Sequence, residues 1–437
     1  MRNSRTAASP SPVSPSLAAI LSFLLPGLGQ VYVRRRIAAV FFAVPVVVVA
    51  GVVLFEARRG AAVLVARLLD PTVAAAVFAA VLVLGAWRLW SVVHAFSAAD
   101  VRSRRRLGER LALCILLVAI VASHALGAWY VGSAYQMDLG IFNVGGLGAE
   151  PAMAPASGPR VTVLLAGLDQ YVTRSERLYD SLMVVSIDKD TNRVAMVSVP
   201  RDTSGYPLYW GGTGKIKINS IPTYVKNGWL NSPDPPVTTL VNEVSFLVGV
   251  PINYYGVLDL GSFMQIIDMV GGVDITNPAA IDDPSYDWLD GSPYGFRLSA
   301  GTHHLNGRNA LAYVRSRHGS GNSDYARAGR QQQVLVAVAH KMATPAMVIR
   351  LPDLMGQASS LVTTNFPASG VADMVDFVQS VPSGNFDSYV LGPPYSVSTS
   401  TATASTSCLD LAKVAPLSVK LFGADSRYSG KTQPATC

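Results

Sequence analysis

Residues 310–333, ALAYVRSRHGSGNSDYARAGRQQQ, are the most arginine-rich part of the second half of the sequence. Only 14% of the 437 residues are charged, yet four arginines crowd here around one acid: Arg315, Arg317, Arg327 and Arg330, with Asp324. Guanidinium groups that share one space repel one another unless an anion lies between them, and each arginine–phosphate contact contributes roughly 1.5–3 kcal/mol. The stretch therefore predicts a diphosphate site. The alternative is a surface where arginines pair with scattered acids.

The elements on either side of the Gly-rich segment HGSGNS (318–323) can bring these side chains together. If residues 310–317 end in an extended conformation, Arg315 and Arg317 point to the same face. From Asp324 to about Met342 the pattern predicts a helix. Side chains three, four or seven residues apart share a helix face. That face would carry Asp324, Arg327 and Gln331, with Arg330 beside them.

Two further acids belong to the same region. Asp169 follows the apolar strand VTVLLAG (161–167), and Asp180 precedes the strand SLMVVSI (181–187). Ends of neighbouring strands lie close together, so the two carboxylates could hold one hard cation, with diphosphate oxygens completing its shell. Mg²⁺ suits such a site, although acids at these positions are also common in turns. The segments SVPRDT (198–203) and KIKINS (215–220) send three more polar side chains toward this cleft: Arg201, Lys217 and Asn219.

Strands and helices alternate from residue 160 onward. Further strands are expected at 193–199 and 252–259, and helices at 234–249, 260–272 and near 369–380. This alternation predicts an α/β fold, a mixed sheet with helices on both faces.

The first 135 residues form a different region. Half of the chain is hydrophobic (50%), more than is usual for a soluble protein. After a polar tail (1–16) that we expect to be disordered, three apolar stretches at 37–55, 72–93 and 111–131 each have the length of a membrane span, about 20 residues. Residues 17–33, interrupted by PGLGQ, form either a re-entrant hairpin or a fourth span.

Arginine sets the orientation of these spans. The first 135 residues hold 14 Arg and no Lys against 4 acids, whereas the remainder is net negative. The clusters at 34–36 and 102–110 should be cytoplasmic, which places everything after about residue 135 outside the cell. Because the positive excess lies among apolar stretches, nucleic acid is not an expected partner. Outside the cell, Cys408 and Cys437 could form a disulfide, and a free pair fits the sequence equally well.

The order of these motifs resembles the LytR-CpsA-Psr family, membrane-anchored enzymes of bacterial envelopes. The matching elements, across about residues 160–345, are LLAGLD, YDSLMVVSI, VSVPRDT, KIN, VGVPINYYGVLDLGSFMQIIDMVGGVDI and GTHHLNGRNALAYVRSRHGSGNSDYARAGRQQQ. The resemblance implies an α/β/α sandwich with a mixed central sheet as the extracytoplasmic catalytic domain (160–345). An all-α transmembrane region (17–135) and a linker (136–159) precede it here, and a C-terminal extension with a flexible tail (346–437) follows.

The resemblance also implies an activity. Family members transfer a glycopolymer from a polyprenyl diphosphate in the membrane to peptidoglycan, typically to the 6-hydroxyl of N-acetylmuramic acid, with Mg²⁺. By motif position, Asp169 and Asp180 resemble the metal-linked acids, and either could also be the general base. Apolar residues of the helices at 237–249 and 260–270 would line the hydrophobic interior that accepts the polyprenyl chain; plain core packing explains them at least equally well. The residues that resemble diphosphate ligands are Arg201, Arg315, Arg317, Arg327 and Gln331, with Lys217 and Arg330 nearby and Asp324 as an orienting acid.

One corner of the site departs from the family pattern. Members often carry an arginine near the first acid and the motif RSDT around the second, whereas here Gln170 follows Asp169 and Arg177 precedes Asp180 by three residues. Two other functions stay open. The same site could hydrolyse the lipid diphosphate with water as the acceptor, or the protein could be a non-catalytic envelope-binding or regulatory protein.

Overall fold

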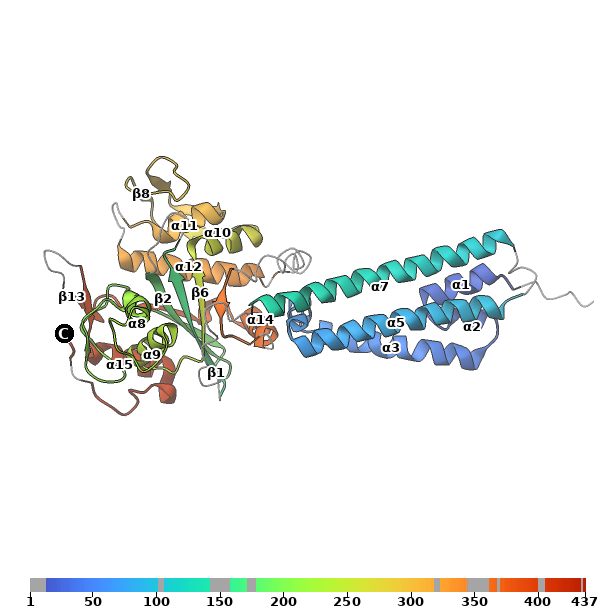
Figure 1. The fold of residues 1–437 in the computed structure, drawn as a ribbon, viewed down its shortest axis with the longest axis horizontal. Coiled ribbons are helices and arrows are strands. Elements are labelled where there is room, and N and C mark those ends of the chain that lie inside the picture. The colour runs from blue at the N-terminus through green and yellow to red at the C-terminus, as the bar shows by residue number, and fades with distance from the viewer. Residues whose placement is uncertain are drawn as a thin grey trace, which may run out of the picture. The chain divides into compact units, whose positions relative to one another are not determined.

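The chain divides into two compact units, Met1–Gln136 and Met137–Cys437. The computed structural model describes residues 13–100, 106–141, 158–170, 178–317, 323–342, 344, 361–367, 370–399, 405–433 and 435–437. Within these residues the first unit contains helices, and the second contains a central sheet with helices on both of its faces (Figure 1).

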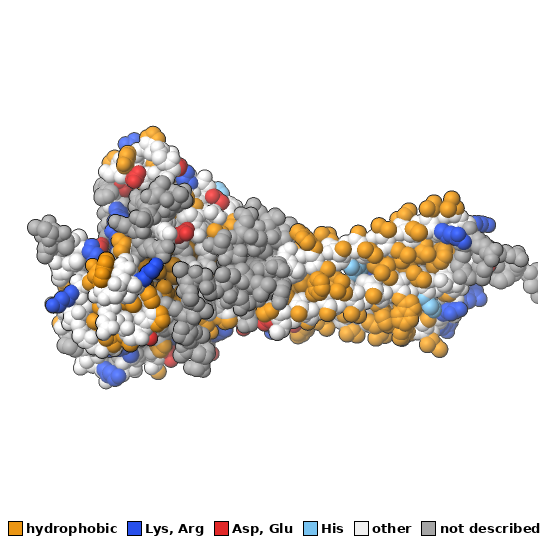
Figure 2. Space-filling view, in the orientation of Figure 1, with side chains coloured by type: hydrophobic (Ala, Val, Ile, Leu, Met, Phe, Trp, Pro, Cys, Tyr) orange, Lys and Arg blue, Asp and Glu red, His pale blue; other side chains and the backbone are white. Residues whose placement is uncertain are grey.

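Three helices of the first unit are long and apolar enough to cross a membrane. They are α3 (Arg36–Ala57), α5 (Pro71–Ala98) and the Leu107–Ser133 part of α7 (Leu107–Ile141). Their order and length agree with the three spans expected from the sequence. Figure 2 shows hydrophobic side chains along the length of this unit and Lys or Arg side chains at one end. Apolar surface of this extent is suited to lipid rather than to water.

Residues 15–32 form a hairpin of two short helices, α1 (Pro15–Leu24) and α2 (Leu28–Tyr32). Helices of 10 and 5 residues are too short to cross a bilayer, which takes about 20 residues. The hairpin is fastened by the buried Gln30, which accepts a hydrogen bond from Ser22 Oγ (2.9 Å) and donates one to the Ser91 carbonyl of α5 (2.9 Å). Between α3 and α5 lie α4 (Ala61–Ala66) and the 3₁₀ turn η1 (Arg67–Leu69).

The second unit is organised around a mixed six-stranded sheet of order β11-β6-β1-β2-β3-β12. Strand β1 pairs antiparallel with β2 and parallel with β6, and β3 pairs antiparallel with β2 and parallel with β12. The register slips at Gly167/Leu168, a bulge that re-aims the chain just before Asp169. The strand bounds are β1 Arg160–Leu168, β2 Tyr179–Asp188, β3 Arg193–Ser198, β6 Tyr254–Asp259, β11 Thr363–Thr364 and β12 Phe386–Val390.

Helices cover both faces of this sheet because successive strand residues point in opposite directions. The face that includes Leu164 and Val184 packs against α9 (Pro236–Val248) and α15 (Leu411–Phe422). The face that includes Met183 and Val185 packs against α12 (Asp324–Met342) and α14 (Val371–Ser380). The predicted α/β/α sandwich is therefore confirmed, and so are the helices expected at 234–249, 324–342 and 369–380.

Smaller elements form a second core beside α12. It contains α10 (Leu260–Met269), α11 (Gly307–Arg315) and the paired strands β7 (Val273–Asn277) with β10 (Gly301–Leu305) and β8 (Ile281–Asp283) with β9 (Phe296–Leu298). The remaining elements are β4 (Tyr206–Pro207), β5 (Thr213–Gly214), η2 (Ile218–Ser220), α8 (Ile221–Lys226), η4 (Ser383–Asn385) and η5 (Gly423–Asp425).

The extended end considered for residues 310–317 is present only beyond Arg315. Helix α11 runs from Gly307 to Arg315, and the chain leaves it at Ser316, so Arg315 is on the helix and Arg317 follows it. The Asn306 side chain caps the helix by accepting a hydrogen bond from Asn309 N (3.0 Å). Residues 310–314 are all buried, and a short, continuously buried apolar run reads equally well as a strand or as an inner helix.

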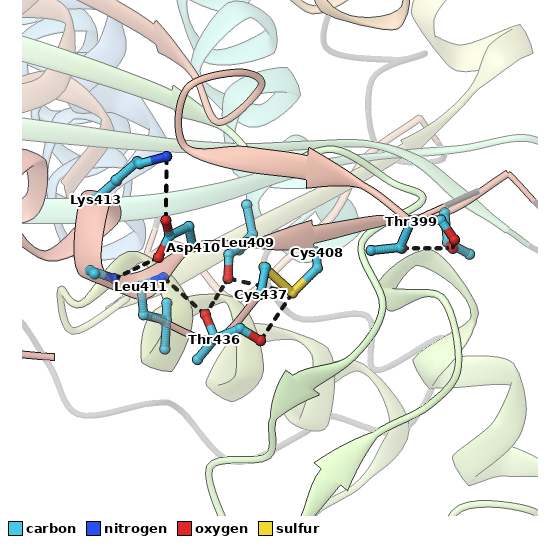
Figure 3. Close-up of a disulfide and its surroundings, with 10 residues drawn as sticks. Thr399, Cys408, Leu409, Asp410, Leu411, Lys413, Thr436 and Cys437 are labelled. Atoms are coloured by element: carbon cyan, nitrogen blue, oxygen red, sulfur yellow. Dashed lines mark hydrogen bonds and ion pairs between the residues drawn. A yellow bond between two sulfur atoms is a disulfide. The ribbon is translucent and has the colours of Figure 1, made fainter. Parts of the chain in front are cut away.

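The C-terminal segment is part of the second unit. After β12, strands β13 (Ser396–Ser398) and β14 (Ser407–Leu409) form a hairpin, and α15 then packs into the main core. A disulfide joins Cys408 to Cys437, and Thr436 Oγ1 accepts a hydrogen bond from Leu411 N (3.0 Å) beside it (Figure 3). The domain boundary expected at residue 345 lies outside the described residues.

A buried acid in this core predicts how stability changes with pH. Glu243 of α9 is 0% exposed, and its Oε2 accepts a hydrogen bond from Tyr209 N (3.2 Å). Burial raises the pKa of this carboxyl from 4.5 to about 8, against the smaller opposing effects of the Tyr209 N–H and the Arg427 charge. A raised pKa means that the stability due to the neutral acid is complete below about pH 4.5 and is lost as pH rises through about 8.

Glu243→Gln should therefore remove this pH dependence. Relative to the parent, the variant should gain stability on going from about pH 5 to about pH 9, on the order of a few kcal/mol at about 1.4 kcal/mol per pKa unit. Urea unfolding of both proteins in detergent, at both pH values, measures the difference. A stability difference that stays constant with pH would contradict a neutral, buried Glu243.

Candidate functional site

A pocket lies where β1 ends and β2 begins. It collects six polar residues that the sequence had singled out, from four separate segments of the chain. They are Asp169, Asp180, Arg315, Arg317, Arg327 and Gln331. The wall between them is apolar and includes Leu258 of β6, Phe263 of α10 and Val314 of α11. The predicted convergence of guanidinium groups beside two carboxylates is thus present.

Arginines contact both carboxylates. Arg201 Nη1 lies 2.5 Å from Asp180 Oδ2, and Arg317 Nη2 lies 3.7 Å from the same oxygen. Arg315 Nη2 lies 3.7 Å from Asp169 Oδ1. Two of these contacts, at 3.7 Å, are longer than a hydrogen bond, whereas Arg201 lies within hydrogen-bonding distance of Asp180. Arg315 Nη1 is buried and has no hydrogen-bond partner among the described residues.

The turn after α11 is held by a buried acid that sequence reasoning did not identify. Asp283 of β8 is 1% exposed, and its Oδ2 accepts hydrogen bonds from Ser316 Oγ (2.8 Å) and from Arg317 N (3.0 Å). Arg330 Nη2 donates to the Ser316 carbonyl (2.5 Å). Asp283 and Arg330 therefore fix the backbone that carries Arg315 and Arg317 into the pocket. Burial lowers the pKa of Arg330 below the ordinary arginine value.

Helix α12 supplies the opposite wall. Arg327 is 6% exposed and lines the pocket, and one turn further Gln331 accepts a hydrogen bond from Ser181 Oγ (2.9 Å). Arg330 is not part of this wall; it lines a separate cavity with Tyr313 and residues 276–281. Asp324 begins α12, but its side chain lies outside the described residues, as does the whole of Arg177.

Arg201 lies in a second pocket that shares a wall with the first. Residues common to both are Asp180, Ser181, Arg327 and Gln331. Next to Arg201, Asp202 accepts from Lys217 Nζ (2.6 Å), and Asn219 Nδ2 donates to Asp180 Oδ1 (3.4 Å). Lys217 is thus brought to the edge of the site through Asp202 rather than into either pocket.

The acidic side chains in the pocket indicate which kind of metal ion could bind there. Among the described residues there is no group of three or more His, Cys, Asp or Glu side chains that could hold a metal by themselves. Asp169 and Asp180 line one pocket with only carboxylate oxygens to offer. A hard cation such as Mg²⁺, which usually takes few protein carboxylates and completes its shell with water and phosphate, fits this set.

A separate apolar cavity of about 330 Å³ lies between the sheet and helices α12 and α14. Its walls include Leu165 of β1, Val185 of β2, Leu335 and Ala339 of α12 and Met374 of α14. The interior expected along residues 237–249 is wrong, because α9 lies on the opposite face of the sheet, where its apolar side chains fill a packed core. Of the other expected helix, Leu260 and Phe263 line the arginine pocket.

Together these features define a class: an α/β/α sandwich that gathers arginines and two acids beside an apolar cavity, on a chain with membrane-length helices. A family model, LytR_cpsA_psr, matches residues 150–391. The chain belongs to the LytR-CpsA-Psr family.

Relatives of known name lie in Bacillus. The chain is 34% identical over 206 residues to the polyisoprenyl-teichoic acid–peptidoglycan teichoic acid transferase TagV of Bacillus subtilis, covering 47% of this chain and 49% of TagV. It is 33% identical over 227 residues to the Bacillus mycoides transferase of the same kind, TagU, covering 52% of this chain and 67% of TagU. It therefore spans about half to two thirds of these relatives.

A solved structure with the same fold comes from Streptococcus agalactiae. Its TM-score is 0.50 at 20% sequence identity, and the match covers 63% of this chain and 91% of that one. At this identity the likeness concerns the fold alone.

Proposed function

We propose that this protein transfers a glycopolymer from a polyprenyl diphosphate to peptidoglycan, forming a phosphodiester with the 6-hydroxyl of N-acetylmuramic acid. The observation that carries the proposal is that the arginine pocket and the apolar cavity follow one another along both α12 and β1. On α12, Gln331 lines the arginine pocket and Leu335, one turn later, lines the apolar cavity. On β1, Gly167 and Leu165 do the same. A ligand with an anionic head and an isoprenoid tail fits this sequence of surfaces.

The chemistry follows from charge. The acceptor hydroxyl oxygen attacks the phosphorus atom that carries the sugar, a new P–O bond forms, and the bond to the bridging oxygen breaks with its electron pair leaving on polyprenyl monophosphate. Negative charge on the phosphoryl oxygens and the leaving group is stabilised by Arg201, Arg315, Arg317 and Arg327, which are held in place before the reaction. Either Asp169 or Asp180 accepts the hydroxyl proton. Both carboxylates line the arginine pocket, where the attacking hydroxyl would meet them.

Magnesium belongs to the proposal as well. Asp169 and Asp180 would hold Mg²⁺ beside the diphosphate, where a divalent ion neutralises phosphoryl charge. The arginines that now face these acids would then turn toward the phosphate oxygens, because carboxylates bound to a cation no longer need them.

We also propose that the second unit works outside the cell, anchored by several membrane spans. Two observations support this placement. The arginines of the first unit cluster at segments that flank the apolar helices, as cytoplasmic loops do. In addition, the Cys408–Cys437 disulfide is typical of an oxidising compartment.

The test is incubation of the full-length protein in detergent with a polyprenyl-diphosphate-linked glycopolymer, with and without peptidoglycan. Transfer predicts phosphodiester-linked product and polyprenyl monophosphate only when peptidoglycan is present. Release of the lipid monophosphate at an equal rate without peptidoglycan would instead identify a hydrolase. No turnover in either mixture, under conditions where the lipid binds, would favour a binding protein.

Chelation tests the magnesium proposal in the same assay. EDTA should reduce transfer by about 10²-fold or more, and Mg²⁺ should restore it, since a bound divalent ion contributes several kcal/mol of charge stabilisation. Asp180→Asn should weaken the Mg²⁺ dependence, so that a higher concentration is needed for half-maximal rate. An EDTA-treated enzyme with full activity would exclude a metal-dependent step.

A further inference from the structure

The second pocket has a wall that comes from outside the family match. The match ends at residue 391, whereas the paired strands β13 and β14, called the hairpin here, follow at residues 396–398 and 407–409. Side chains of β13, of β14 and of the residues just before β14 close the polar pocket that holds Arg201 and Asp202, a cavity of about 90 Å³. These residues in its lining are Ser398, Ser405, Thr406 and Ser407.

The hairpin is fixed to the segment that carries Arg201. Ser407 N donates to the Asp202 carbonyl (3.1 Å), and the Ser407 carbonyl accepts from Ser204 N (2.8 Å). Next to Ser407, Cys408 forms the disulfide with Cys437 (Figure 3). Hydrogen bonds on one side and a covalent link on the other hold the hydroxyl groups at a defined distance from the arginine site.

One of these hydroxyls is buried and unused. Ser407 is 7% exposed, lines the pocket, and its Oγ has no hydrogen-bond partner among the described residues. A buried polar atom in that position costs free energy unless a ligand satisfies it. Ser398 pairs directly with Ser407 across the two strands, so both side chains lie on the same face of the hairpin.

We propose that this pocket binds the sugar residue joined directly to the diphosphate, and that the β13–β14 hairpin selects for it. The inference rests on the proposed function and names a substrate feature of the same site. Along α12, Gln331 lines the arginine pocket and Leu335, one turn later, lines the apolar cavity, while the arginine pocket shares Asp180, Ser181, Arg327 and Gln331 with the hairpin pocket. A linear ligand whose tail enters the cavity and whose diphosphate meets the arginines therefore continues into the hairpin pocket. The serine and threonine hydroxyl groups of the hairpin pocket, together with Asp202, can donate and accept hydrogen bonds, as a sugar ring requires.

The test compares two ligands on the full-length protein in detergent, without peptidoglycan. One is a polyprenyl diphosphate that carries a single N-acetylhexosamine, and the other is the same lipid diphosphate without sugar. Ser407→Ala should weaken binding of the sugar-bearing lipid about three- to tenfold, the loss of one or two neutral hydrogen bonds, and leave the sugar-free lipid unchanged. Ser398→Phe places a large ring in the pocket from an exposed position. It should weaken binding of the sugar-bearing lipid by at least about tenfold.

The matched control is Ser396→Ala. Ser396 lies on the same hairpin, is 3% exposed, and likewise has an Oγ without a hydrogen-bond partner among the described residues, but it does not line the pocket. It should alter neither affinity. If Ser407→Ala and Ser398→Phe lower the affinity for both lipids equally, or for neither, the pocket is not a subsite for the sugar. In a separate transfer assay with peptidoglycan, an effect of Ser407→Ala confined to the KM for peptidoglycan would overturn the subsite too, because the pocket would then hold the acceptor sugar. If the unmodified protein binds neither lipid, the proposed function fails instead.

The disulfide provides an independent arm. Replacing Cys408 and Cys437 together by Ser should loosen the hairpin and lower the preference for the sugar-bearing lipid by a similar factor, while the affinity for the sugar-free lipid is kept. An unchanged preference in a double variant that remains folded would show that the hairpin does not form the sugar-binding wall.

Discussion

Arg315→Ala should lower kcat/KM for glycopolymer transfer by about 10²-fold. Arg315 sits at the last position of α11, is mostly buried, and has a guanidinium nitrogen with no hydrogen-bond partner among the described residues. A diphosphate would engage that nitrogen, and a charged hydrogen bond in a site of this kind contributes roughly 1.5–3 kcal/mol, more where charge develops in the transition state. The kcat/KM of Arg315→Lys should lie between those of the parent protein and of Arg315→Ala. Lysine keeps the positive charge, but an ammonium group cannot make a bidentate contact with phosphate.

The same helix offers the control. Arg308 lies near the start of α11, pairs with Asp290 (2.7 Å) and stacks 3.6 Å from the Trp288 ring centroid, away from both site pockets. Arg308→Ala should leave kcat/KM within about twofold while removing the same charge from the chain. Equal effects of the two substitutions would mean that Arg315 acts through general charge or stability and has no direct contact with the substrate.

Ala339→Trp should abolish efficient use of long-chain lipid donors. Ala339 lines the apolar cavity two turns along α12 from Gln331, so a large ring there occupies space that isoprene units need. Each methylene-sized group left in water costs about 0.8 kcal/mol. Excluding one five-carbon unit should thus raise the Kd of the lipid by roughly 10³-fold, at about 4 kcal/mol.

A short-chain prenyl diphosphate carrying the same sugar serves as the internal control. Its head binds at the arginine pocket and its tail ends before Ala339, so its Kd should stay within about twofold of the parent value. A second variant, Val378→Trp on α14, approaches the same cavity from the other wall and should behave alike. Loss of both ligands together, with unfolding unchanged, would contradict the assignment of the cavity to the lipid chain.

Much of the site could be predicted from the sequence because its charged side chains stand next to strong local patterns. Asp169 and Asp180 flank apolar strands, and β1 and β2 pair antiparallel so that the end of one meets the start of the next. The predicted helix that carries Arg327 and Gln331 is present as α12, and both side chains line the pocket. Where a strand or helix pattern is strong and the spacing of the charged residues agrees with it, the pocket residues can be predicted from the sequence.

Other parts depend on tertiary contacts that leave no local trace. Asp283 lies in a short edge strand far from the motif in sequence, and its role is visible only once Ser316 and Arg317 are seen to bond to it. Arg330 belongs to the arginine-rich stretch, yet it turns inward to the Ser316 carbonyl, because α12 presents it to a different side from Arg327.

The apolar cavity could not be located from hydrophobicity alone. Helices α9 and α12 both bury apolar side chains against the sheet, but only the space under α12 and α14 is left partly unfilled. A periodic pattern reports that a face is buried and says nothing of how completely it is packed. The helix α11 posed a similar difficulty, since its inner residues are buried on all sides.

Helix α12 serves three compartments at once, with Arg327 and Gln331 at the acids, Leu335 and Ala339 at the cavity, and Val334 in the second core. Because an α-helix advances about 1.5 Å per residue, the interval from Gln331 to Ala339 sets a fixed distance of roughly 12 Å between the arginine pocket and the far part of the apolar cavity. Inserting a single residue within that interval would rotate everything downstream by about 100°, so that Leu335 and Ala339 would no longer face the cavity while Gln331 faces the pocket.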